Sequence, residues 1–425
     1  MLRKTEFWTS EKLKNLQEKF LRKVLKFAAA NVPFYRDRIG YNYIRSEVDP
    51  YELIKKFPII DKEVIRQNLP KFFFGSKIRR LKAITGGSTN QPLLFYMDRF
   101  ATRQMEKAFI FDLWGRVGYT FGDSIFTLRA RMPKKGFFIS HDRFFNIYYA
   151  SSIDLNRSSL SNYVNYLNNL RPLFLHGYPS TIYQLVNLIE SSKVRLEFKP
   201  RAVLCGSEKL FDYHRNKIEA MFDCKVFSWY GQSEYLALGG ECEYSHFYHF
   251  YPQYGYLELF PTGIKNDAGK EIFEIVATGF NNPVMPIIRY RTGDYAVPAN
   301  TTQCKCGRNY LFIEDVIGRE QEFVVDANGS LISANCLVYE TYFDNFTGLE
   351  SVQIRQNTPG VMEVVLVRGP HYCDESFLQT KDSLNSLLGE RMRIHFIFTD
   401  QIPKTPIGKA KFVIQELDIG KYLHH

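Results

Sequence analysis

A strand–turn–helix pattern recurs in the middle of the chain and constrains the fold more than any other feature. Apolar segments at 173–177, 200–206 and 225–230 have the length of buried strands, and the first two are followed by segments with helical spacing. Strands that alternate with helices favour an α/β architecture with a parallel sheet. Ligands of such sheets bind at the carboxyl ends of the strands, so we expect the turns at 206–208 and 230–234 to lie at a binding site.

The C-terminal part of the chain has a different pattern of residue types. From about residue 250, short strand-like segments are separated by Gly, Pro and Asn, which predicts a β-rich subdomain. The Asn-Gly pair at 328–329 predicts a hairpin, and a helix is expected to begin at Asp374. A chain of 425 residues is long enough for more than one core. We therefore predict a large domain over 1–317 and a small α+β domain over 318–425.

The N-terminal region predicts helices. Apolar residues recur at three- and four-residue steps between 10 and 30, with Lys and Glu between them, and Thr9 or Ser10 could cap the start. Pro33 is expected to end this helix because the residue before a proline is disfavoured in the helical region. A second helix is expected after Asp61, which would be its N-cap.

The composition is that of a globular protein with a basic charge. The net charge of +10, from 55 Lys+Arg and 45 Asp+Glu, favours anionic partners, although the charges are scattered and also fit a solvated basic surface. No apolar run approaches the ~18 residues of a membrane helix, and the charged N-terminus lacks the apolar segment of a signal peptide. We therefore expect a cytoplasmic protein. Seven cysteines, an odd number, do not suggest a disulfide framework in such a chain.

A loop rich in glycine and hydroxyl residues spans Thr85-Gly86-Gly87-Ser88-Thr89-Asn90-Gln91-Pro92. Its backbone N–H groups can turn inward and form a nest that, with the hydroxyls, suits a polyphosphate. The spacing of a Walker A loop is absent, and similar clusters often mark an ordinary hairpin turn. The loop becomes informative beside the motifs that follow it.

Three further motifs stand in order after this loop: Y-G-Q-S-E at 230–234, R-Y-R-T-G-D at 289–294 and P-K-T-P-I-G-K-A-K at 403–411. Together the four resemble the adenylate-forming superfamily of acyl-CoA synthetases and peptide-synthetase adenylation domains. The chain looks most like the phenylacetate–CoA ligase branch and its capsular-polysaccharide relatives, to which segments 31–35, 57–62 and 304–308 are also similar. The resemblance implies a ligase that uses ATP to convert a carboxylic acid to acyl-AMP, releases pyrophosphate, and then transfers the acyl group.

The resemblance also implies roles for motif residues. Ser88 and Thr89 would hold oxygens of the β- and γ-phosphates. Glu234 would help to bind Mg²⁺, a hard cation that prefers carboxylate and phosphate oxygen. Asp294 would accept hydrogen bonds from the ribose hydroxyls, and Arg319 would meet ribose or phosphate. The alternatives are an ordinary surface carboxylate for Glu234 and a turn residue for Asp294.

Adenine is expected to lie between two segments of the chain. In the family the matching positions sandwich the base, and here they are Gly206-Ser207-Glu208 and Trp229-Tyr230-Gly231. Gln232 and Ser233 complete the second motif and are counted with the nucleotide-binding residues.

Lys409 is the expected catalytic lysine. In the family the lysine of this Gly-Lys pair bridges the substrate carboxylate and the α-phosphate, an attraction that a compact ammonium supplies in a water-poor site. Lys411 is the rival candidate for this role. The alternative is that Lys409 has no catalytic role and is an ordinary lysine of a basic C-terminal tail. Because Lys409 lies in the small domain, the resemblance implies a mobile domain that closes about residues 318–322. Gln321 stands there in place of the family's hinge aspartate.

The sequence leaves two classes of acyl acceptor open, a thiol (CoA) and an amine. CoA is the default, but residues 324–333 look like a polar hairpin instead of the glycine-containing strand with which CoA ligases admit the thiol. The runner-up is an amine, for instance on an amino sugar in polysaccharide biosynthesis. The sequence does not name the acid, whose pocket we place around His176-Gly177-Tyr178 and Trp229, and it does not distinguish a monomer from a homodimer.

Cys304 and Cys306 form a C-x-C pair that suits a soft, structural metal. With Cys242 and His249 they would make a Cys₃His set, which is an accepted zinc arrangement. Relatives in this branch resemble this in holding zinc with such residues. His246 is an alternative fourth ligand, and lone C-x-C pairs are often simply buried.

A third functional hypothesis, a nucleic-acid-binding zinc protein, draws on the net charge, the C-x-C pair and the many aromatic residues. It leaves the four ordered motifs unexplained. We therefore expect small-molecule partners and no nucleic acid.

Overall fold

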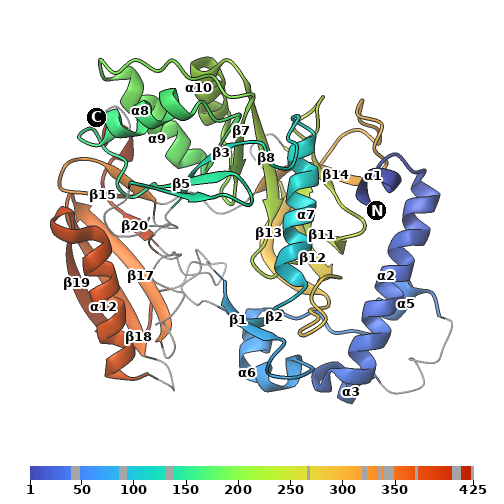
Figure 1. Cartoon of the computed structure of the whole chain (residues 1–425). Helices are drawn as coiled ribbons and strands as arrows, with labels where there is room; N and C mark the ends of the chain where they lie inside the picture. The colour runs from blue at the N-terminus through green and yellow to red at the C-terminus, as the bar shows by residue number, and fades with distance from the viewer. Residues whose placement is uncertain are drawn as a thin grey trace. The chain divides into compact units, whose positions relative to one another are not determined.

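The structure is a computed structural model of the whole chain (Figure 1). The described residues are 1–39, 48–85, 93–129, 138–265, 269–317, 323–333, 337, 349–368, 372–403 and 413–422. Two compact units make up the chain: unit 1 consists of Met1–Thr85, Leu93–Thr120 and Phe227–Gly318, and unit 2 consists of the rest. None of the helices in these described ranges has the length and hydropathy of a membrane span.

Unit 1 combines N-terminal helices with antiparallel strands. Its helices are α1 (Leu2–Thr5), α2 (Ser10–Asn31), α3 (Pro33–Ile39), α5 (Pro50–Ile54), α6 (Lys62–Phe72) and α7 (Thr102–Gly115). Its strands are β1 (Arg80–Ile84), β2 (Leu94–Asp98), most of β8 (Lys225–Gly231), β9 (Leu238–Gly240), β10 (Tyr248–Phe250), β11 (Gly255–Lys265), β12 (Glu271–Gly279), β13 (Tyr290–Pro298) and β14 (Leu311–Ile317). β1 and β2 form a hairpin, and the others lie in the antiparallel order β11-β12-β13-β14-β10-β9-β8. The β-rich region predicted after residue 250 is confirmed.

Helices α2 and α6 of unit 1 begin where the sequence supplies a cap. The side chain of Thr9 accepts a hydrogen bond from the N–H of Lys12 (3.4 Å), so α2 starts at Ser10 as predicted. Asp61 caps α6 in the same way, with the N–H of Val64 at 2.9 Å. Pro33 ends α2 but also begins α3 at once, because proline is tolerated in the first turn of a helix.

The first part of unit 2 is a parallel sheet with helices. The strands are β3 (Ile125–Arg129), β4 (Ile139–Asp142), β5 (Ile147–Ser151), β6 (Phe174–Gly177) and β7 (Ala202–Gly206), and the helices are α8 (Leu160–Leu170), α9 (Pro179–Glu190) and α10 (Asp212–Phe222). The strand order is β7-β6-β3-β5-β4, in which the pairs up to β5 are parallel and β4 is antiparallel to β5. The predicted α/β architecture is therefore confirmed. An apolar core of fully buried side chains lies between these strands and helices.

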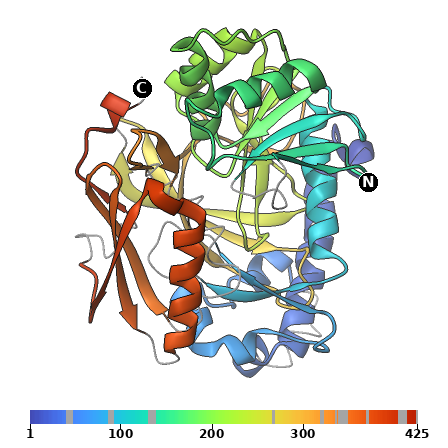
Figure 2. The same ribbon diagram turned by 60° about the vertical axis from the view of Figure 1, so that its left-hand side comes forward.

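The C-terminal part of unit 2 is a small α+β structure. It contains β15 (Phe323–Val325), β16 (Leu331–Ser333), β17 (Leu349–Thr358), β18 (Val361–Arg368), α12 (Asp374–Leu388), η1 (Gly389–Arg391), β19 (Arg393–Thr399), β20 (Val413–Gln415) and η2 (Ile419–Tyr422). The sheet order is β19-β18-β17-β20, and α12 lies along one face of this sheet (Figure 2).

Two sequence signals of the small domain are confirmed. The predicted hairpin joins β15 to β16, with Gly329 at φ +78° in the turn. The predicted helix begins at Asp374, and on it Phe377 packs against Phe396 of β19 with ring centroids 5.4 Å apart. The boundary at 317/318 stays a prediction.

Candidate functional site

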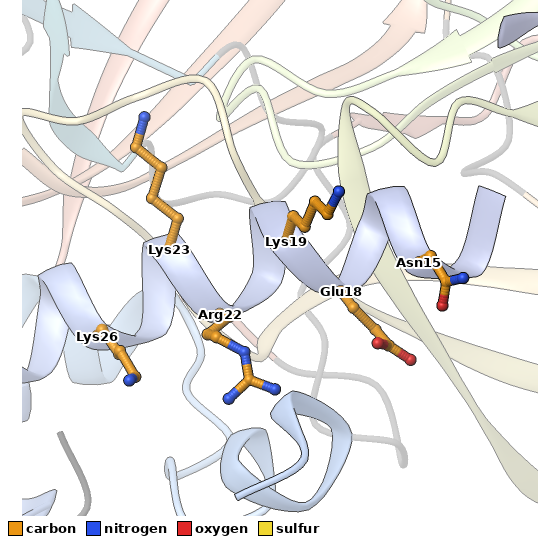
Figure 3. Close-up of a pocket in the computed structure, with 6 residues that line it drawn as sticks. All are labelled: Asn15, Glu18, Lys19, Arg22, Lys23 and Lys26. Carbon is orange, nitrogen blue, oxygen red and sulfur yellow. The ribbon is translucent and has the colours of Figure 1, made fainter. Parts of the chain in front are cut away.

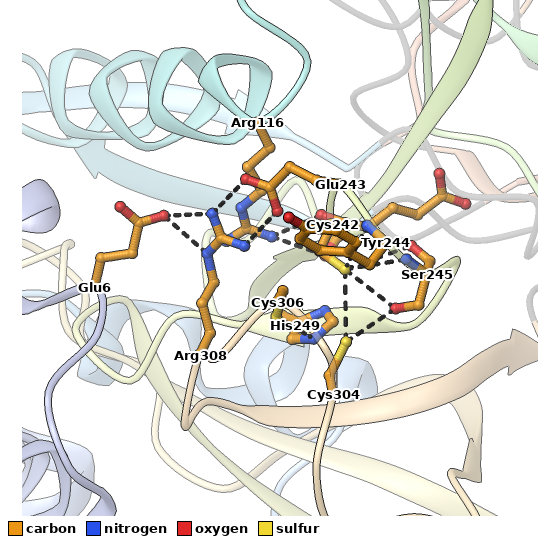
Figure 4. A network of polar contacts seen from close by, with 12 residues as sticks. Glu6, Arg116, Cys242, Glu243, Tyr244, Ser245, His249, Cys304, Cys306 and Arg308 are labelled. Atoms are coloured by element: carbon orange, nitrogen blue, oxygen red, sulfur yellow. Dashed lines mark hydrogen bonds and ion pairs between the residues drawn. The ribbon is translucent and has the colours of Figure 1, made fainter.

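Four side chains that bind soft metals converge in unit 1 (Figure 4). Cys242 follows β9, His249 lies on β10, and Cys304 and Cys306 lie in the turn between β13 and β14. The three Sγ atoms and one ring nitrogen of the histidine all lie within 4.8 Å of one another. Because β10 pairs with both β9 and β14, the sheet joins residues that lie 62 positions apart, such as Cys242 and Cys304.

Cys242 is placed to be a thiolate, the form that binds metals. Its Sγ atom accepts hydrogen bonds from the backbone N–H groups of Tyr244 (3.4 Å) and Ser245 (3.2 Å). The pKa of Cys242 is lowered, chiefly because the Cys306 thiol donates a hydrogen bond to it, and the Ser245 hydroxyl and the N–H of Tyr244 add to the effect. The pKa of Cys306 is raised in return. One thiolate is thus already favoured within the cluster.

His249 presents a lone pair to the cluster. Its Nδ1 lies 2.8 Å from the carbonyl oxygen of Phe247, so Nδ1 carries the proton and donates it to that oxygen. Nε2 lies 3.4 Å from Sγ of Cys306. Burial lowers the pKa of His249 and keeps the ring neutral, which is the form that ligates a metal. The alternative ligand His246 is 58% exposed and pairs with Glu241, so among the described residues His249 completes the set.

Two buried arginines brace the cluster, and sequence reasoning found neither. Arg308 pairs with Glu6 at 2.5 Å and with Glu243 at 2.6 Å. Arg116, which directly follows α7, donates to the carbonyl oxygens of the two residues before Cys242, at 2.9 and 2.8 Å. Arg308 lies two residues after Cys306, but its partner Glu6 lies 302 positions away in the sequence, so no local pattern predicts this pairing.

Two of the sequence motifs are joined by reciprocal hydrogen bonds in unit 1. Tyr230 of Y-G-Q-S-E donates to Asp294 of R-Y-R-T-G-D at 2.7 Å. In the other direction, Tyr290 of the second motif donates to Glu234 of the first at 2.9 Å. Gln232 donates to the Tyr230 oxygen at 2.6 Å, and burial raises the pKa of Tyr230 well above its usual value. We call these five residues the two-motif network.

Trp229 lies on the opposite side of β8 from Tyr230, because side chains alternate along a strand. Its ring packs against Trp114 of α7, with centroids 5.6 Å apart, and is 9% exposed. Of the adenine-binding residues predicted in unit 1, Tyr230 and Gln232 therefore share the network of Asp294, whereas the Trp229 side chain packs against α7. Gly231 ends β8, and Ser233 lies in the turn that follows.

In unit 2, Gly206 ends β7, and Ser207 and Glu208 form the turn that follows the strand. Ser207 has a φ of +73°, a left-handed conformation that a residue with a Cβ adopts at a cost. The carboxylate of Glu208 accepts a hydrogen bond from the hydroxyl of Ser180 (2.6 Å) in the first turn of α9. This bond fixes the turn against the helix.

Several predicted site residues lie outside the described residues. They are Ser88 and Thr89 of the glycine-rich loop, Arg319, the hinge position Gln321, the expected catalytic Lys409 and its rival Lys411.

A shallow hollow of about 520 Å³ runs along the solvent side of α2 (Figure 3). The residues that line it are Asn15, Glu18, Lys19, Arg22, Lys23 and Lys26. They belong to the face of α2 opposite the buried Leu21 and Leu25. We call this the basic face of α2.

Comparison with protein families and curated sequences gives three matches. Residues 324–416 match the family model described as CapK C-terminal domain. Protein CapK of Staphylococcus aureus is 25% identical over 414 residues, which cover 95% of this chain and 89% of that protein. Phenylacetate-coenzyme A ligase of Thermus thermophilus is 22% identical over 361 residues, which cover 74% of this chain and 72% of that enzyme.

Solved structures share the fold. The chain is similar to 2-hydroxyisobutyryl-CoA ligase in the postadenylation state with an acyl-AMP ligand, R3-HIB-AMP, with a TM-score of 0.58, 16% identity, and coverage of 99% of this chain and 93% of that one. It is also similar to the same ligase with 2-HIB-AMP and CoA in the thioesterification state, with a TM-score of 0.57, 17% identity, and coverage of 99% and 93%. These likenesses extend over nearly the whole chain.

Proposed function

Because the chain belongs to the adenylate-forming superfamily of ligases, we propose that it activates a carboxylic acid with ATP and then transfers the acyl group to an acceptor. In the first step a carboxylate oxygen attacks the α-phosphorus. The bond from that phosphorus to the bridging oxygen breaks, and pyrophosphate leaves with the electron pair. The products are acyl-AMP and pyrophosphate.

The reciprocal bonding of the two motifs is the observation that carries this proposal. A ribose-binding acid and a metal-binding acid must keep a fixed relation to one another if both contact the same nucleotide. Tyr230 holds Asp294, and Tyr290 holds Glu234, so each motif positions the acid of the other.

The residues of this network have distinct tasks in the proposed reaction. Asp294 accepts hydrogen bonds from the ribose hydroxyls, and Tyr230 and Gln232 keep its carboxylate oriented. Glu234, 6% exposed, offers a carboxylate oxygen to Mg²⁺. The ion, when bound with ATP, neutralises phosphate charge. Burial of Glu234 strengthens this electrostatic attraction because the local dielectric constant is low.

The roles of the remaining motif residues rest on the motifs alone. Ser88 and Thr89 hold the outer phosphates, Arg319 contacts ribose or phosphate, and Lys409 stabilises charge between the carboxylate and the α-phosphate.

CoA is the acceptor we favour, because one relative carries the name of a CoA ligase and one similar structure contains CoA. An amine acceptor is the second candidate. The hairpin of β15 and β16 supports it, because the turn carries the polar residues Asp326 and Asn328 where CoA ligases use a glycine-containing strand.

We also propose that Cys242, His249, Cys304 and Cys306 hold a structural zinc ion. Three thiol groups and one imidazole, each offering one atom within 4.8 Å of the others, are a donor set that zinc accepts. The hydrogen bond from His249 Nδ1 to a backbone carbonyl is the outer support that zinc-binding histidines use. Four protein ligands leave no open position, so the role is structural.

Pyrophosphate–ATP exchange over a panel of carboxylic acids tests the adenylation reaction. We expect at least one acid to stimulate exchange of labelled pyrophosphate into ATP, because acyl-AMP formation is reversible. Hydroxylamine or CoA added afterwards distinguishes an amine from a thiol as the group that discharges the adenylate. Purified protein that binds AMP but shows no exchange with any acid of the panel would contradict the proposed reaction.

A further inference from the structure

The positive charge of the chain is concentrated at its N-terminal end. Residues 1–26 hold eight Lys and Arg against three Glu, so this segment carries half of the net charge of +10. The acidic residues are Glu6, Glu11 and Glu18, and Glu6 is already paired with the buried Arg308. The cations of α2 therefore dominate the charge of this region.

Four lysines lie on one side of α2. They are Lys12, Lys19, Lys23 and Lys26. At about 3.6 residues per turn they fall within about 60° of one another around the helix axis, and at about 1.5 Å per residue they extend over about 21 Å of its length. Leu21 and Leu25, on the other side, are fully buried in the core of unit 1. Lys12 thus continues the basic face of α2 toward its N-terminus.

The basic face attracts anions without favouring one direction. Three of the four cations that line it are lysines, whose ammonium group is a compact point charge. Nη1 of the fourth, Arg22, donates to the carbonyl oxygen of Val48 at 2.8 Å. The side chains spread to both sides of the helix axis, and one carboxylate, that of Glu18, lies among them (Figure 3). Such a strip suits a surface with many negative charges better than a single anionic group.

Two exposed aromatic side chains lie at the start of the same helix. Trp8 directly precedes the N-cap Thr9 and is 36% exposed, and Phe7 is 60% exposed. The amide of Asn309 donates to the carbonyl oxygen of Trp8 at 2.9 Å, and the guanidinium of Arg308 lies 5.4 Å from the centre of the Phe7 ring. Tryptophan is enriched where proteins meet lipid headgroups, because its ring is apolar and its N–H is polar.

We propose that the basic face of α2, together with Lys12, Phe7 and Trp8, docks unit 1 on the surface of an anionic lipid bilayer. The apolar side of α2 stays in the protein core, so the helix lies on the headgroups and the lysines supply electrostatic attraction. The aromatic rings add apolar contact. Lysine predominates over arginine here, which favours lipid over nucleic acid, because arginine forks suit nucleic-acid phosphates. The inference goes beyond the proposed adenylation reaction and does not depend on it.

Cosedimentation of the full chain with lipid vesicles, without ATP or acid, measures the docking. The vesicles consist of phosphatidylcholine alone or of phosphatidylcholine mixed with an equal amount of phosphatidylglycerol. We expect the wild type to bind the mixed vesicles only. The triple variant Lys19→Gln, Lys23→Gln, Lys26→Gln should bind them on the order of 100-fold more weakly, because each lysine near an anionic surface contributes about 5-fold. Gln has nearly the helix propensity of Lys, so α2 should persist.

A second triple variant removes the same charge elsewhere and is the matched control. It carries Lys71→Gln, Lys193→Gln and Lys381→Gln. These exposed lysines lie on α6, after α9 and on α12, so they form no strip with one another. Binding to the mixed vesicles should stay close to that of the wild type. Thermal unfolding shows whether each variant is folded.

The fluorescence of Trp8 gives an independent readout. The chain has three tryptophans, of which Trp114 and Trp229 are only 4% and 9% exposed, so a change on mixing with vesicles comes chiefly from Trp8. We expect its emission to shift to shorter wavelength as the ring enters the headgroup region. Trp8→Phe should abolish the shift while the protein still binds the vesicles.

Three outcomes would overturn the inference. The first is a wild type that binds neither kind of vesicle or both equally. The second is an equal loss of binding in the two triple variants, which would leave net charge as the cause. The third is binding to duplex DNA that depends on the α2 lysines, without binding to vesicles. An unchanged Trp8 emission in vesicle-bound protein would remove the aromatic residues from the docking surface.

Discussion

The cysteine–histidine cluster and the two-motif network lie in the same unit but are organised in opposite ways. In the cluster, four donor atoms lie within 4.8 Å of one another, one following β9, one on β10 and two in the turn between β13 and β14. In the network, the carboxylates of Glu234 and Asp294 are each directed to a tyrosine of the other motif. The cluster is complete without any further residue. In the proposed reaction the network is only part of a site, because the residues assigned to the phosphates and to the catalytic lysine lie in other motifs. This contrast matches the two proposed roles, a structural metal site for the cluster and nucleotide binding for the network.

The largest effect is expected when two of the proposed metal ligands are removed, which tests the structural role of the cluster. We expect wild-type protein purified without chelator to contain about one zinc per chain. The double variant Cys304→Ser, Cys306→Ser should lose the metal and unfold at a temperature lower by on the order of 10 °C, because loss of a structural metal is among the most destabilising single causes. Elemental analysis and thermal unfolding measure both effects.

Cys373→Ser is the control for this pair, because Cys373 is exposed and lies outside the cluster. The proposal would be contradicted if wild-type protein contained no zinc and the double variant were as stable as the wild type. The cysteines would then be ordinary core residues.

Lys409→Ala separates binding from chemistry on the network side. It should slow adenylation by on the order of 10²–10³, the usual cost of one preorganised group that stabilises charge in the transition state. ATP binding should stay nearly intact, since the other motifs supply most nucleotide contacts. Pyrophosphate–ATP exchange kinetics measure the adenylation rate, and calorimetry measures the ATP affinity.

Lys411→Ala provides the internal control and should be mild. If Lys411 proves essential and Lys409 dispensable, the motif is read two residues out of register. If neither substitution matters, the small domain takes no part in adenylation.

Asp294→Ala tests the network directly. The ribose hydroxyls lose their acceptor and Tyr230 loses its partner, so AMP affinity should fall by roughly 1–3 kcal/mol, or about 5- to 150-fold. Calorimetry with AMP measures the loss, and the zinc content should not change. An unchanged AMP affinity would remove Asp294 from the nucleotide site.

Tyr230→Phe is expected to have the smallest effect. It removes one hydroxyl that orients Asp294, and a single hydrogen bond contributes a net of about 0.5–1.5 kcal/mol, so AMP affinity should fall by about 2- to 10-fold. In the double variant with Asp294→Ala the two effects should be less than additive, because the residues act as one pair. Full additivity would mean that the tyrosine does not act through the aspartate.

Local signals in the sequence predicted where helices begin, whereas contacts between residues far apart in the sequence could not be predicted from it. Thr9 and Asp61 were identifiable as caps because a cap acts within three residues. The three cysteines were identifiable from their chemistry, but the choice between His246 and His249 depends on how β10 pairs with its neighbours. No spacing rule expresses that register.

The strands and braces that were missed share the same cause. β4, β5 and β17 were missed, the last although Pro359-Gly360 marks the turn after it, because the pairing of these strands is decided across the sheet. The burial of Trp229 against α7 follows from which face of β8 meets that helix, a tertiary fact. Alternation along β8 sends the side chains of Trp229 and Tyr230 to opposite sides of the strand.

The basic face of α2 has a consequence for how the protein responds to salt. Lys19, Lys23 and Lys26 follow one another at steps of four and three residues, which puts the Cβ atoms of neighbours roughly 5–6 Å apart. This spacing is shorter than the Debye length of about 8 Å at physiological ionic strength, so their potentials overlap into one continuous strip. In about 1 M salt the Debye length falls to about 3 Å and the strip separates into isolated charges. The pull of this face on any anion should therefore weaken steeply with ionic strength, whereas the buried pair of Arg308 and Glu6 is screened much less.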